Sequence, residues 1–384
     1  MPTTESLPDQ LVALRRLAPR PLGLYMMWLN SVHLTARAKA LSTADGAVMQ
    51  AVEAHAAEEL RRFLAGVAAY RHSPYQRPAP DYKVVAERGR AKLLDCGGYG
   101  TPVVLVPSLV NKGYILDLLP DVSLVNSLLA AGYQVLLVDW GTPTVDPATQ
   151  LTVDGAVELL QALLARAAEL AGEVPVGLGY CMGGTLLAAA AALQPTLVQA
   201  AVFVATPWDF SHCPGVEMAR QAVPLLEKIT WPGGLVPVDV LQGLFMLLEP
   251  TGAIERLQAF GETTDAGHLR RMTVLEDWLT DGVPLEAAIA TSCMVDWYGA
   301  NKPLQNQWQV LGQTVALQAL ACPTLTVIAE RDTLVPSASS AALAAALPES
   351  TTLSVPAGHI GLMAGRKAVS HFHQPLCEWL GLTV

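Results

Sequence analysis

The sequence carries little charge. Of its 384 residues, 15 % are Asp, Glu, Lys or Arg, whereas soluble chains average about a quarter. The 34 acidic and 24 basic residues leave a formal net charge of −10, and 52 % of the residues are hydrophobic. So much apolar surface builds a large core, which excludes intrinsic disorder. Because no long run of Lys and Arg is present, we expect no nucleic-acid partner.

Long apolar runs are absent as well. No stretch reaches about 18 uninterrupted apolar residues, the minimum for a spanning helix, because Gln194 and Pro195 divide the most apolar region, residues 182–205. We therefore predict no transmembrane helix. The first residues do not follow the charged-then-apolar layout of a secretory signal, which predicts a cytoplasmic protein.

Metal and cofactor motifs are also missing. The six cysteines are widely spaced without a CxxC pair, so we expect free thiols. His371 and His373 have no Cys or carboxylate partner at ligand spacing, and we expect no metal site. Gly177 and Gly179 lack the third glycine of a dinucleotide fingerprint. The sequence thus predicts no resident cofactor.

Short strand-like segments alternate with helical ones after residue 83. The strand-like runs are apolar on both faces, as parallel strands inside a sheet are: residues 101–107, 133–140, 174–180, 200–206 and 323–330. Helical patterns occupy residues 123–132, 153–172 and 185–193. This alternation predicts an α/β fold with a mostly parallel sheet covered by helices on both faces.

Two other regions interrupt this pattern. Residues 1–80 are rich in Ala, Leu, Arg and Glu and predict a helical N-terminal segment, which a Pro-rich stretch separates from the rest. Residues 207–315 contain most of the Trp and several helical patterns. We interpret 207–315 as a helical cap inserted into a core formed by 81–206 and 316–384, because ligands bind beyond the carboxyl ends of parallel strands.

The most specific motif is Gly179-Tyr180-Cys181-Met182-Gly183. It follows an apolar strand and opens an Ala-rich helix, which matches the G-x-S-x-G nucleophile elbow with Cys in the Ser position. Glycines at its ends let the strand and the helix pass closely around a strained turn. A thiol at a helix N-terminus is favoured as the thiolate. We predict that Cys181 is a nucleophile.

An elbow needs an acid and a histidine further along the chain, in that order. Asp332 follows a predicted strand, and His359 lies on a loop after the next strand-like run. His359 would take the proton from Cys181, and Asp332 would hold the imidazole in the required tautomer. Glu330 is the second choice for the acid.

Two backbone N–H groups are expected to bind the oxyanion of the reaction. The residue after the nucleophile, Met182, supplies the first. The loop after the first central strand supplies the second, for which we nominate Val110.

These segments carry a family resemblance. Residues 107–118 resemble the N-K-x-Y-I-L-D-L segment of polyhydroxyalkanoate synthases, and residues 179–185 resemble their lipase-like box, in which Cys replaces Ser. Residues 332–336 and 358–361 resemble the acid and histidine segments of the same family. The similarity covers roughly residues 85–380. The resemblance implies an α/β-hydrolase fold, and in length the chain is similar to the short, two-subunit synthases.

The resemblance also implies a function. It points to an acyltransferase that polymerises 3-hydroxyacyl-CoA with release of CoA, which enters as part of the substrate, through an acyl-Cys181 intermediate. The implied partners are this substrate, a polyester granule surface, and a second synthase subunit or a second copy of the chain. The alternative is a Cys-dependent hydrolase, either a thioesterase or an oligoester or lactone hydrolase. A third hypothesis, suggested by the apolar composition and the helical N-terminus, is a non-enzymatic granule-surface or partner-binding protein.

Overall fold

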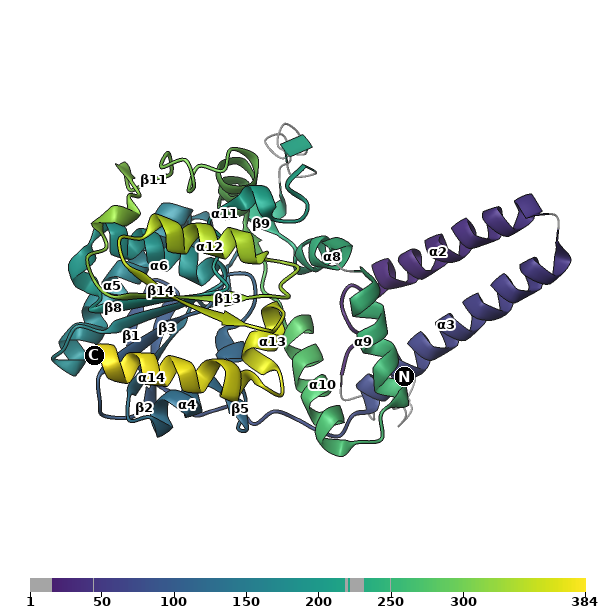
Figure 1. The fold of residues 1–384 in the computed structure, drawn as a ribbon, viewed down its shortest axis with the longest axis horizontal. Coiled ribbons are helices and arrows are strands. Elements are labelled where there is room, and N and C mark those ends of the chain that lie inside the picture. Colours follow the sequence, from purple (N-terminus) through teal and green to yellow (C-terminus); the bar gives the residue numbers. More distant parts are fainter. Residues whose placement is uncertain (1–15, 44, 218–219, 222–230, 249) are drawn as a thin grey trace, which may run out of the picture. The chain divides into compact units, whose positions relative to one another are not determined.

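A single sheet organises the computed structural model, with eight strands in the order β1-β2-β6-β3-β7-β8-β13-β14 (Figure 1). The structure describes residues 16–43, 45–217, 220–221, 231–248 and 250–384. In sheet order the strands are Lys83–Arg88, Ala91–Gly97, Gln134–Asp139, Pro102–Val106, Val176–Tyr180, Ala200–Val204, Thr324–Ala329 and Ser350–Val355. The pairs β1–β2 and β2–β6 are antiparallel, and the six strands from β6 to β14 pair in parallel.

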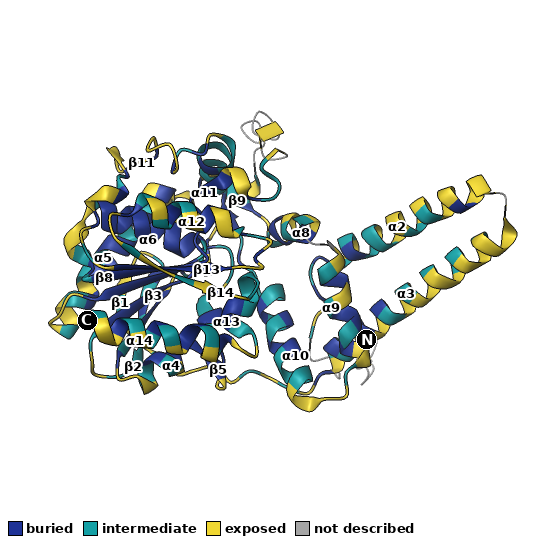
Figure 2. Cartoon of the chain, viewed as in Figure 1, coloured by how far each residue is buried: buried dark blue, intermediate teal, exposed yellow. Residues whose placement is uncertain are grey.

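The central strands are hydrophobic because both of their faces are covered. Every residue of β3, β7, β8 and β13 is buried (Figure 2). The helices α5 (Val153–Ala171), α6 (Met182–Leu193) and α12 (Ser337–Ala346) cover one face. The helices α4 (Leu124–Ala130) and α14 (Gln374–Thr383) cover the other (Figure 1). The predicted α/β class, with a mostly parallel sheet between two helical layers, is confirmed.

By their contacts the described residues divide into two compact units. The first joins the chain up to Pro78 to Asp239–Thr280, and the second comprises Ala79–Val238 and Asp281–Val384. The predicted cap, residues 207–315, therefore contributes 239–280 to the first unit and its remaining described residues to the second. The role of 207–315 as a cap over a site stays a prediction.

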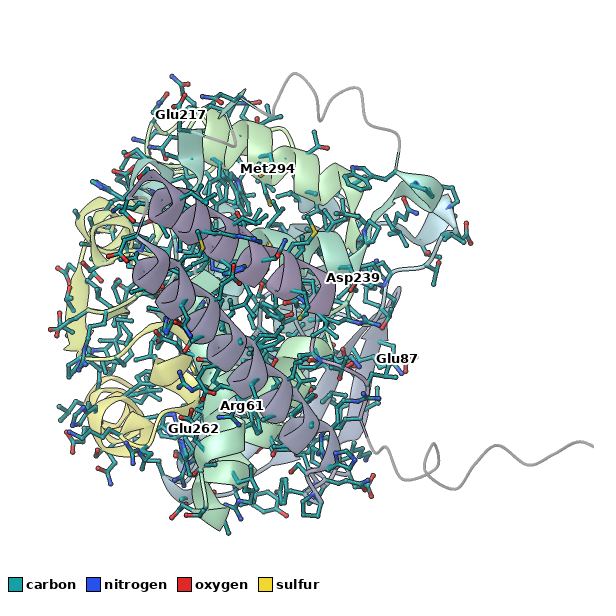
Figure 3. The ribbon with its side chains drawn as sticks, turned by 90° about the vertical axis from the view of Figure 1, so that its right-hand side faces the viewer. Arg61, Glu87, Glu217, Asp239, Glu262 and Met294 are labelled. Atoms are coloured by element: carbon teal, nitrogen blue, oxygen red, sulfur yellow. The ribbon has the colours of Figure 1, made fainter. Side chains whose placement is uncertain are left out.

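The first unit is helical. Its elements are α2 (Leu22–Thr43), α3 (Gly46–His72), α8 (Val238–Leu248), α9 (Pro250–Glu262) and α10 (Ala266–Thr280). Figure 3 shows α2 and α3 side by side, with Arg61 labelled on α3 and Glu262 on α9. The neighbour of Arg61, Arg62, binds Glu262 through Nε and Oε1 at 2.7 Å. Among the described helices none is both long enough and apolar enough to cross a membrane.

Polar contacts join the end of α3 to α10. The Tyr70 hydroxyl donates to Asp277 Oδ1 at 2.9 Å, and Arg16 donates to both oxygens of the same carboxylate. Next to them the hydroxyls of Ser73 and Thr273 are 2.8 Å apart in a buried position. The N-terminal helices and residues 239–280, which lie far apart in the sequence, are therefore linked by buried and partly buried hydrogen bonds as well as by apolar packing.

Replacing Phe63 with alanine should destabilise this first unit. Phe63 is fully buried in a cluster with Tyr25, Leu257 and Phe260, and its ring meets Tyr25 edge-on. Truncating a buried Phe costs about 3–5 kcal/mol, since the cavity does not refill. The adjacent Leu64 is 47 % exposed, so Leu64→Ala is the matched control, with little expected change. Urea unfolding of both variants measures the difference, and equal midpoints would contradict the packing described.

Candidate active site

Cys181 stands in a strained turn between β7 and α6. Its backbone has φ 56° and ψ −127°, a region that a residue with a side chain adopts at a cost of about 1–3 kcal/mol. Neighbouring hydrogen bonds hold the turn. The Cys181 N–H donates to Val204 O at 2.9 Å, and the Cys181 carbonyl accepts from Gly184 N at 2.9 Å. This is the geometry of a nucleophile elbow.

Three glycines let the chain segments around the elbow approach each other. A Cβ on Gly179 would lie 2.4 Å from Gly184 Cα, and one on Gly183 would lie 2.2 Å from Val106 O. A Cβ on Gly184 would lie 1.9 Å from Thr206 Oγ1. Strand, helix and loop can meet here only where side chains are absent.

Replacing Gly179 with alanine should therefore impair folding. The new methyl group would collide with the backbone of Gly184, which cannot rotate away as a side chain can, and we expect a loss of about 3 kcal/mol in the free energy of unfolding. Gly155→Ala in α5 is the control, because a Cβ there would lie at an ordinary contact distance of 3.6 Å from the side chains of Leu151 and Thr152. Denaturant unfolding followed by circular dichroism tests both. A Gly179 variant as stable as the natural chain would refute the close contact.

The structure brings the predicted acid and histidine together. His359 is the first residue of α13 (His359–Ala364), and Asp332 lies just beyond the carboxyl end of β13. His359 Nδ1 is 2.7 Å from Asp332 Oδ2, and the Asp332 side chain is fully buried. Its other oxygen, Oδ1, accepts from the N–H groups of Leu334 and Val335 at 2.9 and 2.8 Å. The aspartate is therefore fixed by its own loop, and one oxygen is left to orient the imidazole.

Cys181 is the third member of this group. Burial by itself would lower the pKa of His359. The charge of Cys181, together with hydrogen bonds to Asp332 and to Cys181, outweighs burial and raises the pKa of His359 to about 10. An imidazole held between a cysteine sulfur and a carboxylate, with its charged form favoured, is the arrangement of a cysteine–histidine pair.

The other five cysteines differ in their environment. All six cysteines are free, as the sequence predicts. Burial raises the pKa of Cys96 and of Cys213 to about 12, and it also raises the pKa of Cys293, Cys322 and Cys377. Such thiols are poor nucleophiles at neutral pH.

The two predicted oxyanion donors occupy different positions. Met182 is the first residue of α6, where backbone N–H groups have no partner within the helix. The Val110 N–H donates to Ser108 Oγ at 3.3 Å, and its carbonyl accepts from Val283 N at 3.4 Å. The loop after β3 is thus held by residues 282–283, to which Asn111 is also joined by a β-bridge. The role of Met182 and Val110 as oxyanion donors stays a prediction.

Sequence reasoning missed one contact and left one choice open. The residue before the nucleophile, Tyr180, stacks on His359 with ring centroids 5.0 Å apart. No periodicity or spacing signals this contact, because it joins residues 179 positions apart. Glu330, the second choice for the acid, is exposed, whereas Asp332 binds His359.

An aromatic cluster follows β8. Trp208, Phe210, Trp297 and Trp308 are buried and meet ring to ring at centroid distances of 5.4–6.0 Å. Tyr298 packs edge-on against Phe210, and burial together with the charges of Cys213, Cys181 and Cys293 raises the pKa of its hydroxyl. Most of these aromatic side chains form core, and Tyr298 lies within electrostatic reach of Cys181.

The two histidines near the C-terminus, His371 and His373, differ in burial. His373 is buried, its Nδ1 is 3.0 Å from Ser127 Oγ, and burial lowers its pKa to about 4. His371 is half-buried. In the part of the chain that the structure describes, no three His, Cys, Asp or Glu side chains gather closely enough to hold a metal ion.

The chain is similar to known proteins over most of its length. Residues 103–371 match the model of the alpha/beta hydrolase family. The poly(3-hydroxyalkanoate) polymerase subunit PhaC of Synechocystis sp. is 30 % identical over 297 residues, which are 73 % of this chain and 77 % of that protein. The chain belongs to the poly(3-hydroxyalkanoate) polymerase family. This membership confirms the resemblance inferred from the sequence.

Other relatives of this polymerase-family chain carry the same description. The PhaC subunit of Allochromatium vinosum is 29 % identical over 292 residues, 73 % of this chain and 80 % of that protein. The PhaC subunit of Haloferax mediterranei is 28 % identical over 295 residues, and the chain spans only 58 % of that longer protein. Among solved structures, a bromoperoxidase described as BpoC from Mycobacterium tuberculosis superposes with a TM-score of 0.51 at 18 % identity, covering 80 % of this chain and all of that one. That likeness concerns the fold alone.

The N-K-x-Y-I-L-D-L segment of this polymerase-family chain makes specific polar contacts. Lys112 Nζ is 2.8 Å from Asp281 Oδ1, and the Tyr114 hydroxyl donates to Asp281 Oδ2 at 3.3 Å. At the other end, Asp117 accepts from the hydroxyls of Tyr82 and Ser123 at 2.7 and 2.6 Å. The segment thereby holds the loop after β3 beside residues 281–283.

Proposed function

We propose that this protein is an acyltransferase that polymerises 3-hydroxyacyl-CoA into polyhydroxyalkanoate. The observation that carries the proposal is a cysteine on a nucleophile elbow, next to an imidazole bound by a buried aspartate, in a chain of the poly(3-hydroxyalkanoate) polymerase family. The nucleophile is Cys181, the base is His359, and Asp332 orients the base. Coenzyme A enters as part of the substrate, and no resident cofactor is required.

The first step transfers the acyl group to the enzyme. His359 takes the thiol proton of Cys181, and the sulfur attacks the thioester carbonyl of the substrate. Backbone N–H groups, for which Met182 and Val110 are the candidates, stabilise the oxyanion. The bond between the carbonyl carbon and the CoA sulfur then breaks, and His359 returns the proton to that sulfur. The products are acyl-Cys181 and free CoA.

The second step forms the polymer ester. The hydroxyl of another hydroxyacyl unit attacks the carbonyl of acyl-Cys181 while His359 accepts the hydroxyl proton. As the new C–O bond forms, the bond from carbon to the Cys181 sulfur breaks, and His359 gives the proton back to the thiol. The chain is one unit longer and the enzyme is regenerated.

A cysteine suits this chemistry better than a serine. An oxyester on serine would be about as stable as the polymer ester, so little free energy would drive transfer to an alcohol. A thioester on Cys181 is close in energy to the acyl-CoA donor and remains reactive towards a hydroxyl. Covalent catalysis thus divides one transfer into thiol exchange and ester formation.

Incubation with 3-hydroxybutyryl-CoA tests the proposal. We expect release of CoA together with an insoluble polyester, quantified by a thiol reagent and by the dry weight of the product. Release of CoA with formation of only 3-hydroxybutyric acid would overturn the polymerase proposal in favour of a Cys-dependent thioesterase. The absence of CoA release would overturn both.

The proposal extends to location and partners. The product would be an insoluble polyester, so we place the protein in the cytoplasm at the surface of polyester granules. Several relatives are named polymerase subunits, which supports action together with a second subunit or a second copy of the chain. Sedimentation of the purified chain with and without substrate measures its assembly, and a chain that stays a monomer while fully active would contradict this part.

A further inference from the structure

Tyr180 contacts His359 in two independent ways. The two rings are stacked with centroids 5.0 Å apart and planes inclined by 28°. The Tyr180 hydroxyl donates to the His359 carbonyl oxygen at 3.2 Å. Tyr180 is the last residue of β7, and its side chain is only 3 % exposed. One side chain on a central strand therefore holds both the imidazole and the backbone of the residue that carries it.

The imidazole is bounded on each side by a different element. Asp332 binds its Nδ1 at 2.7 Å, and Cys181 interacts with the same ring from the elbow. The face of the ring rests on Tyr180. Because Tyr180 is covalently next to Cys181, the same strand end positions both the base and the nucleophile.

The remaining titratable groups on neighbouring elements make other contacts. Besides β7 and the loop after β13, α13 packs against the short helix η1 (Gly113–Leu116) and against β5 (Val122–Ser123). On η1, Tyr114 donates to Asp281. Beside β5, Asp117 accepts from Ser123 and Tyr82. Within the described part of the chain, Cys181, Asp332 and Tyr180 each interact directly with His359.

We propose that Tyr180 is a positioning residue whose ring face stabilises the imidazolium form of His359 and so widens the pH range over which the thiolate–imidazolium pair exists. The proposal rests on the proposed function only in assigning Cys181 and His359 to one reaction. An aromatic face attracts a cation within about 6 Å of the ring centre, and a neutral imidazole gains much less. The stacking therefore favours the charged imidazole over the neutral one.

The hydroxyl has the second task of fixing the backbone of His359. Burial and the charges of Cys181 and Asp332 raise the pKa of Tyr180 well above its ordinary value. The phenol consequently stays protonated and remains a hydrogen-bond donor at every pH at which the enzyme would work. Phenylalanine would preserve the ring contact and lose only this hydrogen bond.

Alkylation of Cys181 by iodoacetamide tests the proposal without any acyl-CoA substrate. Its rate is measured across pH, and the modified peptide is identified by mass spectrometry to separate Cys181 from the other cysteines. For Tyr180→Met we expect the pH midpoint of alkylation to move up by about half a unit to one unit, the size of a typical cation–aromatic contact. Tyr180→Phe should keep the midpoint of the natural chain, since the ring remains.

A second set of variants keeps the shape of the side chain. Phenylalanine and its fluorinated analogues at position 180 have similar volumes but progressively weaker ring quadrupoles, so the midpoint should rise with the number of fluorines. A midpoint that is independent of fluorination, or one that Tyr180→Phe shifts as far as Tyr180→Met, would overturn the proposal. Because alkylation needs no substrate, a failure of the polymerase proposal would leave this result unaffected.

Discussion

Replacing Cys181 with alanine should reduce CoA release from 3-hydroxybutyryl-CoA by about 10⁶-fold, the loss typical of deleting the nucleophile of a catalytic triad. The elbow brings the Cys181 thiol to His359, and the neighbouring Tyr180 phenol does not replace it, because its raised pKa keeps it protonated. The measurement is the initial rate of CoA release at saturating substrate.

The matched control for this variant is Cys377→Ala. Cys377 lies on α14, its thiol is 3.8 Å from the carbonyl oxygen of Ser127 on α4, and burial raises the pKa of this thiol. We expect it to release CoA at the rate of the natural chain. If Cys181→Ala retains that rate, Cys181 is not the nucleophile. Cys181→Ser separates the two activities, because a synthase should lose polymer formation while a hydrolase keeps measurable esterase activity.

Replacing Asp332 with asparagine should lower kcat by about 10⁴-fold, as it does for the equivalent aspartate of serine proteases. The reason lies in the two oxygens of Asp332. One accepts from Leu334 and Val335, and this role passes to the asparagine oxygen. The amide NH₂ group is then directed at His359 Nδ1, which forces the proton onto the other ring nitrogen. The imidazole would hold a proton where it has to accept one.

The same substitution should change the pH dependence. The negative charge of Asp332 helps to raise the pKa of His359 to about 10. Without that charge the pKa of His359 falls, so the imidazolium is lost at lower pH. The alkaline limb of the pH–rate profile therefore shifts to lower pH. The control is Glu330→Gln, because Glu330 is exposed and lies two residues away. An effect of Glu330→Gln equal to that of Asp332→Asn would contradict the assignment of the acid.

Much of this site is encoded locally. The elbow is recognisable because its glycines and its cysteine are consecutive and lie between an apolar strand and an Ala-rich helix. The order of Cys181, Asp332 and His359 follows from strand ends, which hydrophobic runs mark in the sequence. The neighbouring sequence does not decide whether Asp332 or Glu330 binds the histidine. Both follow β13 within three residues, and only the fold of the loop buries one of them and exposes the other.

Contacts between distant segments could not be predicted. Tyr180 and His359 meet because β7 ends beside α13, and strand order in a sheet is set by packing rather than by periodicity. Likewise Phe63 and Leu257 share one cluster although nearly two hundred positions separate them. Helical patterns in both segments were visible, but an amphipathic face shows only that a helix is covered, not by which partner.

The sequence by itself therefore determined the fold class, the elbow and the candidate residues of the reaction, because each depends on neighbours within a few positions. Only the tertiary structure decided which carboxylate binds His359, which ring supports it, and which helices pack with the N-terminal segment. Each hydrophobic face could pack against several partners. The arrangement that buries all of these faces together is decided by the whole chain, not by any one segment.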